Sequence, residues 1–139
     1  MPAILGHAAL AARDPERLAG FYAELLGWRV VRRTANELGG ALVELGGRPE
    51  EEHELVLAGR AEARHLAFRV DSLDELLARH AGCSDVLLAH CTGVAVSFFL
   101  LDPEGNAVEL YWATGRGRLP EPVPVDLAEG ADAVLALLP

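Results

Sequence analysis

The chain has 139 residues, of which 51% are hydrophobic and 24% are charged, a mix typical of one globular domain that excludes a disordered, collagen-like or disulfide-stapled protein. Its formal net charge is −9, and all 12 cationic side chains are arginines. An acidic chain without lysine argues against nucleic acid or an anionic membrane surface as a partner.

Neither the cysteines nor the first residues indicate export. Cys83 and Cys91 form no Cys-x-x-Cys motif and no disulfide framework. No apolar run reaches the roughly 18 residues that a membrane span needs. No basic segment precedes an apolar one near the first residue, so the sequence has no signal-peptide pattern. We therefore expect a soluble protein of the cytoplasm.

The first half of the chain predicts one strand, one helix and three further strands. A short apolar strand opens at His7. A helix follows, because Asp14 suits its cap, Pro15 suits its first position and Gly27 is a natural stop. Turn residues then separate three strand candidates. These are Trp28–Arg33, Ala41–Leu45 and about His53–Ala58.

The second half repeats this order, which is an internal repeat. A strand opens at His65, and a helix runs from about Ser72 to Gly82. The segment Asp102–Asn106 predicts a hairpin turn between the last two of three further strands. The strand candidates are Asp85–Ala89, Val94–Leu101 and Ala107–Trp112. The order β-α-β-β-β therefore occurs twice, in modules of about 4–58 and 64–113 within a domain of residues 1–113.

Residues 114–139 have a different composition. Glycines and arginines at 115–118, followed by Pro120, Pro122 and Pro124, predict an extended linker. A capping box at Asp126–Glu129 predicts a short helix that ends at Leu138. This tail packs either on the domain or on a partner, and the sequence leaves both open.

Strand alternation predicts which side chains share a face. Side chains along a strand point to opposite faces in turn. With the apolar residues of each strand assigned to the helix-covered core, His65, Glu109 and His7 fall on the remaining faces. Ionisable groups that point inward are costly to bury without a partner, so we expect these three side chains to meet in one cavity.

Two imidazoles and one carboxylate are a metal-ligand set. Bound to one side of a divalent ion they leave positions open for other ligands, as in non-heme Fe(II) oxygenases. His7, His65 and Glu109 therefore suit Fe(II), and Mn, Ni or Zn can occupy the same arrangement.

The doubled module, the two strands that open with histidine, and the segment Asp102–Tyr111 together resemble the vicinal oxygen chelate superfamily. This superfamily includes glyoxalase I, fosfomycin-resistance transferases, bleomycin-resistance proteins and type I extradiol dioxygenases. The resemblance covers about residues 4–113. It implies an α+β fold in which the two modules form an open eight-stranded mixed β-barrel around a metal cleft, with His7, His65 and Glu109 as the metal ligands.

Two further histidines resemble those of one-domain extradiol dioxygenases. The segments around His53 and His90 are similar to those that carry the non-ligand active-site histidines, and we expect both to be catalytic. The family's active-site tyrosine falls at position 99, where this chain has Phe99. We expect Phe99 and Tyr111 to contact the substrate, with Tyr111 or water replacing the missing hydroxyl.

The implied reaction is extradiol cleavage of a catechol-type aromatic by O2 at Fe(II), within aromatic catabolism. A glyoxalase-type isomerase stays open, with Glu52 or Glu54 as a fourth ligand, as does a fosfomycin-type thiol transferase with Arg69, Arg116 or Arg118 around its anionic substrate. A metal-free antibiotic-binding protein is the non-enzymatic alternative. The resemblance also implies a homodimer, with the modules paired within one chain or swapped between two.

Overall fold

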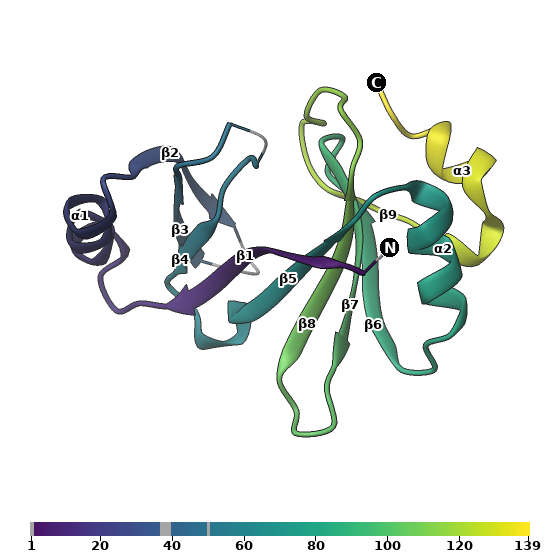
Figure 1. Cartoon of the computed structure of the whole chain (residues 1–139), viewed down its shortest axis with the longest axis horizontal. Helices are drawn as coiled ribbons and strands as arrows, with labels where there is room; N and C mark the ends of the chain where they lie inside the picture. Colours follow the sequence, from purple (N-terminus) through teal and green to yellow (C-terminus); the bar gives the residue numbers. More distant parts are fainter. Residues whose placement is uncertain (1, 37–39, 50) are drawn as a thin grey trace. The chain divides into compact units, whose positions relative to one another are not determined.

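The computed structural model describes residues 2–36, 40–49 and 51–139 (Figure 1). Its strands are β1 (Ile4–Ala11), β2 (Arg29–Asn36), β3 (Gly40–Gly46), β4 (Leu55–Ala58), β5 (His65–Val70), β6 (Val86–Cys91), β7 (Ala95–Leu101), β8 (Ala107–Ala113) and β9 (Val123–Pro124). The helices are α1 (Pro15–Leu26), α2 (Leu73–Ala81) and α3 (Ala131–Leu135), with short 3-10 helices η1 (Ala61–Ala63) and η2 (Leu127–Glu129).

The predicted α+β fold is confirmed. The order strand, helix and three strands occurs twice in the described chain. The sheet is mixed, because β1 pairs with β4 in parallel while β2–β3, β3–β4, β6–β7 and β7–β8 pair in antiparallel. It is open, with β2 and β9 as its outer strands, and β9 is an addition to the eight strands predicted.

The chain forms two compact units. One is Gly6–Leu66, and the other is Ala67–Pro139 with the N-terminal residues up to Leu5. β1 and β5 each contribute residues to both units. The predicted domain limits, with modules of about 4–58 and 64–113 and a tail of 114–139, remain a prediction.

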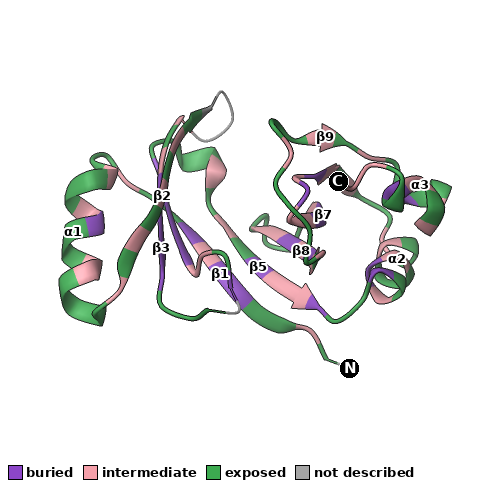
Figure 2. Cartoon of the chain, turned by 90° about the horizontal axis from the view of Figure 1, so that it is seen from above, coloured by how far each residue is buried: buried purple, intermediate pink, exposed green. Residues whose placement is uncertain are grey.

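In the unit Gly6–Leu66, α1 covers one face of strands ordered β2-β3-β4-β1. The helix begins and ends as predicted, since the Asp14 carboxylate accepts the Arg17 N–H and Gly27 adopts a left-handed conformation with φ 68°. Its core consists of Ala19, Val43, Leu45, Leu55 and Leu57. Ala19 is the buried residue of α1, and Leu18, Tyr22 and Ala23 are half-buried against the same core. Figure 2 shows the rest of the helix in the colours of half-buried and exposed residues. The opposite strand face is left for polar side chains.

In the other unit, α2 and the tail pack against strands ordered β5-β8-β7-β6-β9. The Ser72 hydroxyl accepts the Glu75 N–H and caps α2. The core consists of Val70, Leu73, Leu76, Cys91, Val96, Phe98, Leu127 and Val134. The last two belong to η2 and α3, so the tail packs on this unit, which settles an alternative that the sequence left open.

The tail differs from the prediction in two ways. Instead of a plain linker, Val123 and Pro124 pair with Cys91 and His90 of β6. Proline is tolerated there because an outer strand leaves one side of its backbone unpaired. The predicted single helix is also divided, because Gly130 adopts φ 92° between η2 and α3, and α3 ends at Leu135 rather than at Leu138.

The hairpin turn Asp102–Asn106 forms as predicted between β7 and β8. The Asp102 carboxylate accepts hydrogen bonds from the Glu104 and Asn106 N–H groups and from the Asn106 side-chain amide. The hydrogen bonds from the side chain and backbone of Asn106, with that from Glu104, lower the pKa of Asp102 below its ordinary value. No helix among the described residues is long and apolar enough to cross a membrane.

Candidate metal and substrate site

His7 and His65 form a close pair within the unit Gly6–Leu66. His7 lies on β1 and is buried, and His65 is the first residue of β5. Their Nε2 atoms are 3.1 Å apart, and their rings meet edge to face with centroids 5.2 Å apart. β1 begins at Ile4, so His7 lies within its strand rather than opening it as predicted. The histidines on the first strands of the two modules therefore bring the same ring nitrogen to one point.

The backbone determines which His65 nitrogen carries the proton. Nδ1 lies 2.8 Å from the Ala63 carbonyl oxygen at the end of η1. A carbonyl oxygen only accepts hydrogen bonds, so Nδ1 donates and Nε2 of the neutral imidazole keeps its lone pair. A backbone carbonyl on the second nitrogen is the usual support for a metal-binding histidine.

This pair fits a divalent cation. Two imidazole nitrogens at about 2.1 Å from one ion, in adjacent positions, lie about 3 Å from each other. The Nε2 atoms of His7 and His65 have this separation. Burial of His7 keeps water from competing for the nitrogen.

A third histidine lies beside this pair. β4 begins at Leu55, so His53 precedes the strand rather than opening it. Its ring meets that of His7 edge to face with centroids 4.4 Å apart, and its Nδ1 lies 2.9 Å from Oε1 of Glu44. Glu44 is buried on β3 and was not among the predicted site residues. Its signal in the sequence is a single carboxylate in the otherwise apolar strand Gly40–Gly46.

Glu54 holds the loop that carries His53. Its carboxylate accepts hydrogen bonds from the Gly47 and Arg48 N–H groups and pairs with the Arg48 guanidinium. Burial raises the pKa of Glu54, but these backbone donors and the Arg48 charge outweigh burial and leave the pKa below its ordinary value. This carboxylate is engaged in holding the loop, which disfavours it as a fourth metal ligand.

Glu109 and Tyr111 lie on β8 in the other unit, and both are buried. Across the ladder Glu109 is opposite Phe99, and Tyr111 is opposite Ser97. Ser97 is in turn opposite His90 on β6. These five side chains therefore share the face that the core residues Val96 and Phe98 do not use.

The same face has an aromatic contact, and it carries a polar residue that was not predicted. The rings of His90 and Phe99 meet edge to face with centroids 5.5 Å apart. Ser97 is 1% exposed, and its hydroxyl has no hydrogen-bond partner among the described residues. A single hydroxyl between Val96 and Phe98 in an otherwise apolar strand was the available signal, and the register of β6, β7 and β8 places it beside His90 and Tyr111.

The predicted residues thus form two sets. His7, His53 and His65 lie together in one unit, and His90, Phe99, Glu109 and Tyr111 share one sheet face in the other. Their roles, and the joining of the two sets at one ion, remain predictions.

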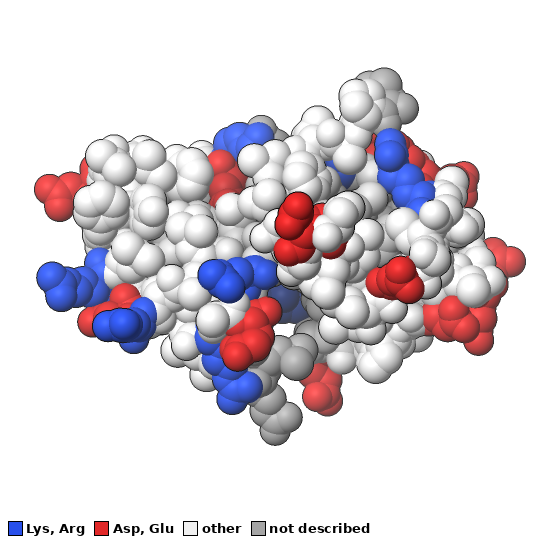
Figure 3. Space-filling view, turned by 90° about the horizontal axis from the view of Figure 1, so that it is seen from below, with Lys and Arg blue, Asp and Glu red and all other residues white. Residues whose placement is uncertain are grey.

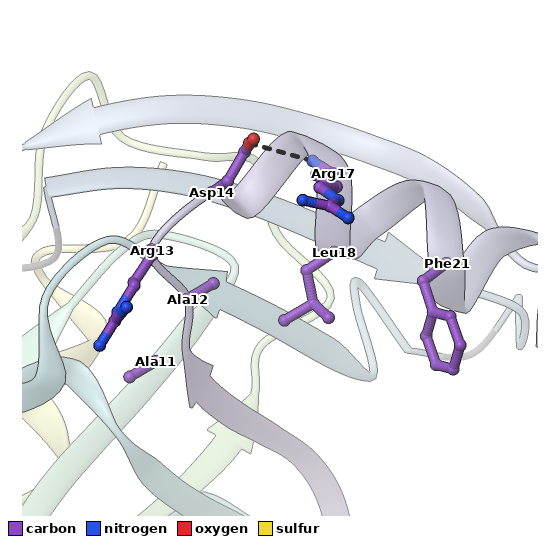
Figure 4. Close-up of a pocket in the computed structure, with 7 residues that line it drawn as sticks. All are labelled: Ala11, Ala12, Arg13, Asp14, Arg17, Leu18 and Phe21. Atoms are coloured by element: carbon purple, nitrogen blue, oxygen red, sulfur yellow. Dashed lines mark hydrogen bonds between the residues drawn. The ribbon is translucent and has the colours of Figure 1, made fainter.

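One surface hollow lies apart from the predicted site residues. A hollow beside the start of α1 is lined by residues of 11–18 and by Phe21, and none of the predicted site residues lines it (Figure 4). Asp14 is engaged there in capping Arg17 N–H. On the face drawn in Figure 3, arginines and carboxylates are interspersed with broad uncharged areas.

Comparisons with known proteins agree with this arrangement. Residues 7–111 match the family model of a glyoxalase-like domain. The protein named "Uncharacterized protein YwkD" of Bacillus subtilis (strain 168) is 30% identical over 120 residues, which cover 76% of this chain and 93% of the relative.

Three solved structures have a similar fold. The 2,2',3-trihydroxybiphenyl 1,2-dioxygenase of Sphingomonas wittichii strain RW1 is 22% identical with a TM-score of 0.62, over 89% of this chain and 44% of that one. A Mn(II)-bound glyoxalase from Novosphingobium aromaticivorans is 19% identical with a TM-score of 0.60, over 86% and 43%. A methylmalonyl-CoA epimerase is 23% identical with a TM-score of 0.56, over 80% and 95%. The chain therefore spans less than half the length of the first two.

Proposed function

Because the chain belongs to the glyoxalase-like domain family of the vicinal oxygen chelate superfamily, we propose that it is a metal-dependent extradiol dioxygenase. Its substrates are a catechol-type aromatic and O2, its metal is Fe(II), and its ligands are His7, His65 and Glu109. The observation that carries the proposal is the approach of the His7 and His65 Nε2 atoms to 3.1 Å. We also propose that it acts as a homodimer in the cytoplasm.

His7, His65 and Glu109 would hold the cation, which would supply positive charge and open coordination positions to a catechol and O2. The chain's own contribution is to prepare the ligands. Ala63 O orients His65 through Nδ1, burial protects His7, and Glu109 supplies a negative charge from a buried position on β8. With two neutral histidines and one anionic glutamate as ligands, a divalent cation would keep a net positive charge. That charge would favour the ionised form of a catechol.

His53 and His90 are the proposed acid–base residues. A ring nitrogen of one takes the proton from a substrate hydroxyl, and the other donates or anchors at the second oxygen. The Phe99 ring contacts His90 and supplies an apolar surface for the aromatic ring of the substrate, while Tyr111 offers a hydroxyl on the same strand face.

An isomerase of the glyoxalase or epimerase type is the second candidate. Glu44 favours it, because a buried carboxylate in the first half of the chain lies beside the histidine set. Phe99 favours it too, since a phenylalanine cannot donate a hydrogen bond to a catecholate oxygen.

Oxygen uptake distinguishes the two reactions. The protein is loaded anaerobically with Fe(II), mixed with a panel of small catechols and exposed to air in an oxygen electrode. We expect O2 consumption and a yellow ring-opened product. His53→Ala and His90→Ala are expected to lower turnover by at least about 100-fold while keeping the bound iron. The proposal would be overturned if no catechol led to O2 uptake while the protein with Mn(II) or Ni(II) isomerised a hemithioacetal or epimerised a 2-methylmalonyl thioester.

A further inference from the structure

We propose that Glu44 is a positioning residue that keeps the proton of His53 on Nδ1 and so presents Nε2 of that ring to the substrate. The inference rests on the proposed function for the reaction that His53 serves, but its structural part stands on the contact between the two side chains. Oε1 of Glu44 lies 2.9 Å from Nδ1 of His53.

The sheet brings the two residues together from different strands. Within this unit β4 lies between β3 and β1. Glu44 on β3 is opposite Val56 of β4, and Val56 is opposite Ala9 of β1. His53 lies just ahead of β4, so it contacts Glu44 on one neighbouring strand and His7 on the other.

The backbone around His53 is held on both sides. The Glu54 N–H donates to the Leu45 carbonyl, and the Ala8 N–H donates to the Glu54 carbonyl. The Glu54 side chain closes the preceding loop onto Gly47 and Arg48. His53 therefore enters the space between Glu44 and His7 on a fixed segment.

The contact between Glu44 and His53 is buried, which makes it energetically important. The Glu44 side chain is 9% exposed and that of His53 is 15% exposed. An ionised carboxylate at this depth is costly without partners. Oε1 faces Nδ1 of His53 at 2.9 Å, and Oε2 lies 3.7 Å from Nε of Arg32, the residue opposite on β2, as an ion pair beyond hydrogen-bond distance. The carboxylate therefore lies between the Arg32 guanidinium and the His53 ring.

The chemistry of the pair determines the tautomer. A carboxylate is only an acceptor, so the nitrogen that faces it carries the proton. The lone pair of the neutral ring then lies on Nε2, on the side away from Glu44. A histidine held in the wrong tautomer loses most of its capacity as a base even when its position is kept. Glu44 thus acts through His53 and does not touch the substrate.

The tautomer can be read directly in the metal-free chain by 15N NMR of the imidazole nitrogens at one fixed pH. His53→Asn identifies the His53 signals. We expect Nδ1–H in the unmodified chain and a shift of His53 toward Nε2–H in Glu44→Leu. Glu24→Leu removes an exposed carboxylate from α1 of the same unit and serves as the matched control, with no expected change. An unchanged His53 tautomer in Glu44→Leu would overturn the proposal.

Kinetics of the iron-loaded variants give the second readout. Glu44→Leu is expected to lower kcat by about 10- to 1,000-fold, with KM and bound iron unchanged, while Glu44→Gln, whose amide oxygen still accepts from Nδ1, recovers much of the rate. Loss of iron from Glu44→Leu would contradict the proposal, because it would make Glu44 a support for the metal ligands. If Glu44→Leu does not fold, Glu44→Ala takes its place in both measurements. If no catechol is turned over by the unmodified chain, yet the tautomer shifts as expected, the proposed reaction fails and the role of Glu44 in orienting His53 stands.

Discussion

At position 99 the chain carries an aromatic ring without a hydroxyl, opposite Glu109 and in contact with His90. We predict that Phe99→Tyr raises kcat/KM for a catechol by about 10-fold, because one added hydrogen bond to a substrate oxygen in a dry site is worth about 1 kcal/mol or more. Stopped-flow or oxygen-electrode rates measure this change.

Phe21→Tyr is the control for that substitution, since Phe21 is 58% exposed on α1 and belongs to no candidate site. Tyr111→Phe tests the other hydroxyl on the face and should lower kcat/KM by a similar factor. Phe99→Tyr without effect on any substrate that is turned over would show that position 99 does not face the reacting oxygens.

The sheet face of a single side chain can be predicted from the alternation along its own strand. His7, His65 and Glu109 were predicted from alternation and from the repeat. The Nε2 atoms of His7 and His65 lie 3.1 Å apart, and the role of the three residues as metal ligands stays a prediction. Glu44 was not predicted, because its importance depends on the register between β3 and β4 and on a loop that returns His53 to it. Contacts that depend on two strands and a loop leave no periodic signal in a sequence.

Among the elements, the turn between β7 and β8 is the one whose sequence most directly determines its structure. Asp102 accepts the donors of Asn106 and Glu104, and these bonds lower its pKa. A depressed pKa stabilises the fold above the ordinary aspartate pKa of about 3.9, and this contribution is lost as pH falls through the lower pKa of the folded chain.

We therefore predict that Asp102→Ala lowers the urea midpoint at pH 7 and that the difference from the unmodified chain shrinks toward pH 3. Glu104→Ala is the matched control, because Glu104 contributes only its backbone N–H to the turn. An Asp102→Ala difference that is equal at pH 7 and pH 3 would show that the ionised carboxylate contributes nothing beyond the turn's shape.

The tail was the least predictable element. Its prolines and glycines predict an extended backbone, but the pairing of Val123 with Cys91 depends on β6 having an unpaired edge. Likewise the burial of Leu127 and Val134 depends on the core beneath them. Composition predicts the local backbone conformation of a segment. The position of this tail is determined by its packing on β6 and on the core of the unit.

Across the whole molecule, the candidate ligands are spread over β1, β5 and β8. An ion bound by residues this far apart in the chain binds the folded state and not the unfolded one. We predict that Mn(II), used as an oxygen-stable probe, raises the free energy of unfolding by about 2.7 kcal/mol at 100 times its Kd. Urea unfolding with and without the metal measures this increase, and a chelator should reverse it.

We expect this increase to depend on the three proposed ligands. His65→Ala and Glu109→Gln are each expected to remove most of it, whereas His53→Ala and the exposed control Glu24→Leu keep it. Retention of the full increase in Glu109→Gln would show that only the histidine pair of the unit Gly6–Leu66 binds the metal. Loss of the increase in both His65→Ala and Glu109→Gln would show that residues from both halves of the repeat bind the same ion. A single metal requires this, because each module contributes only one histidine from its first strand.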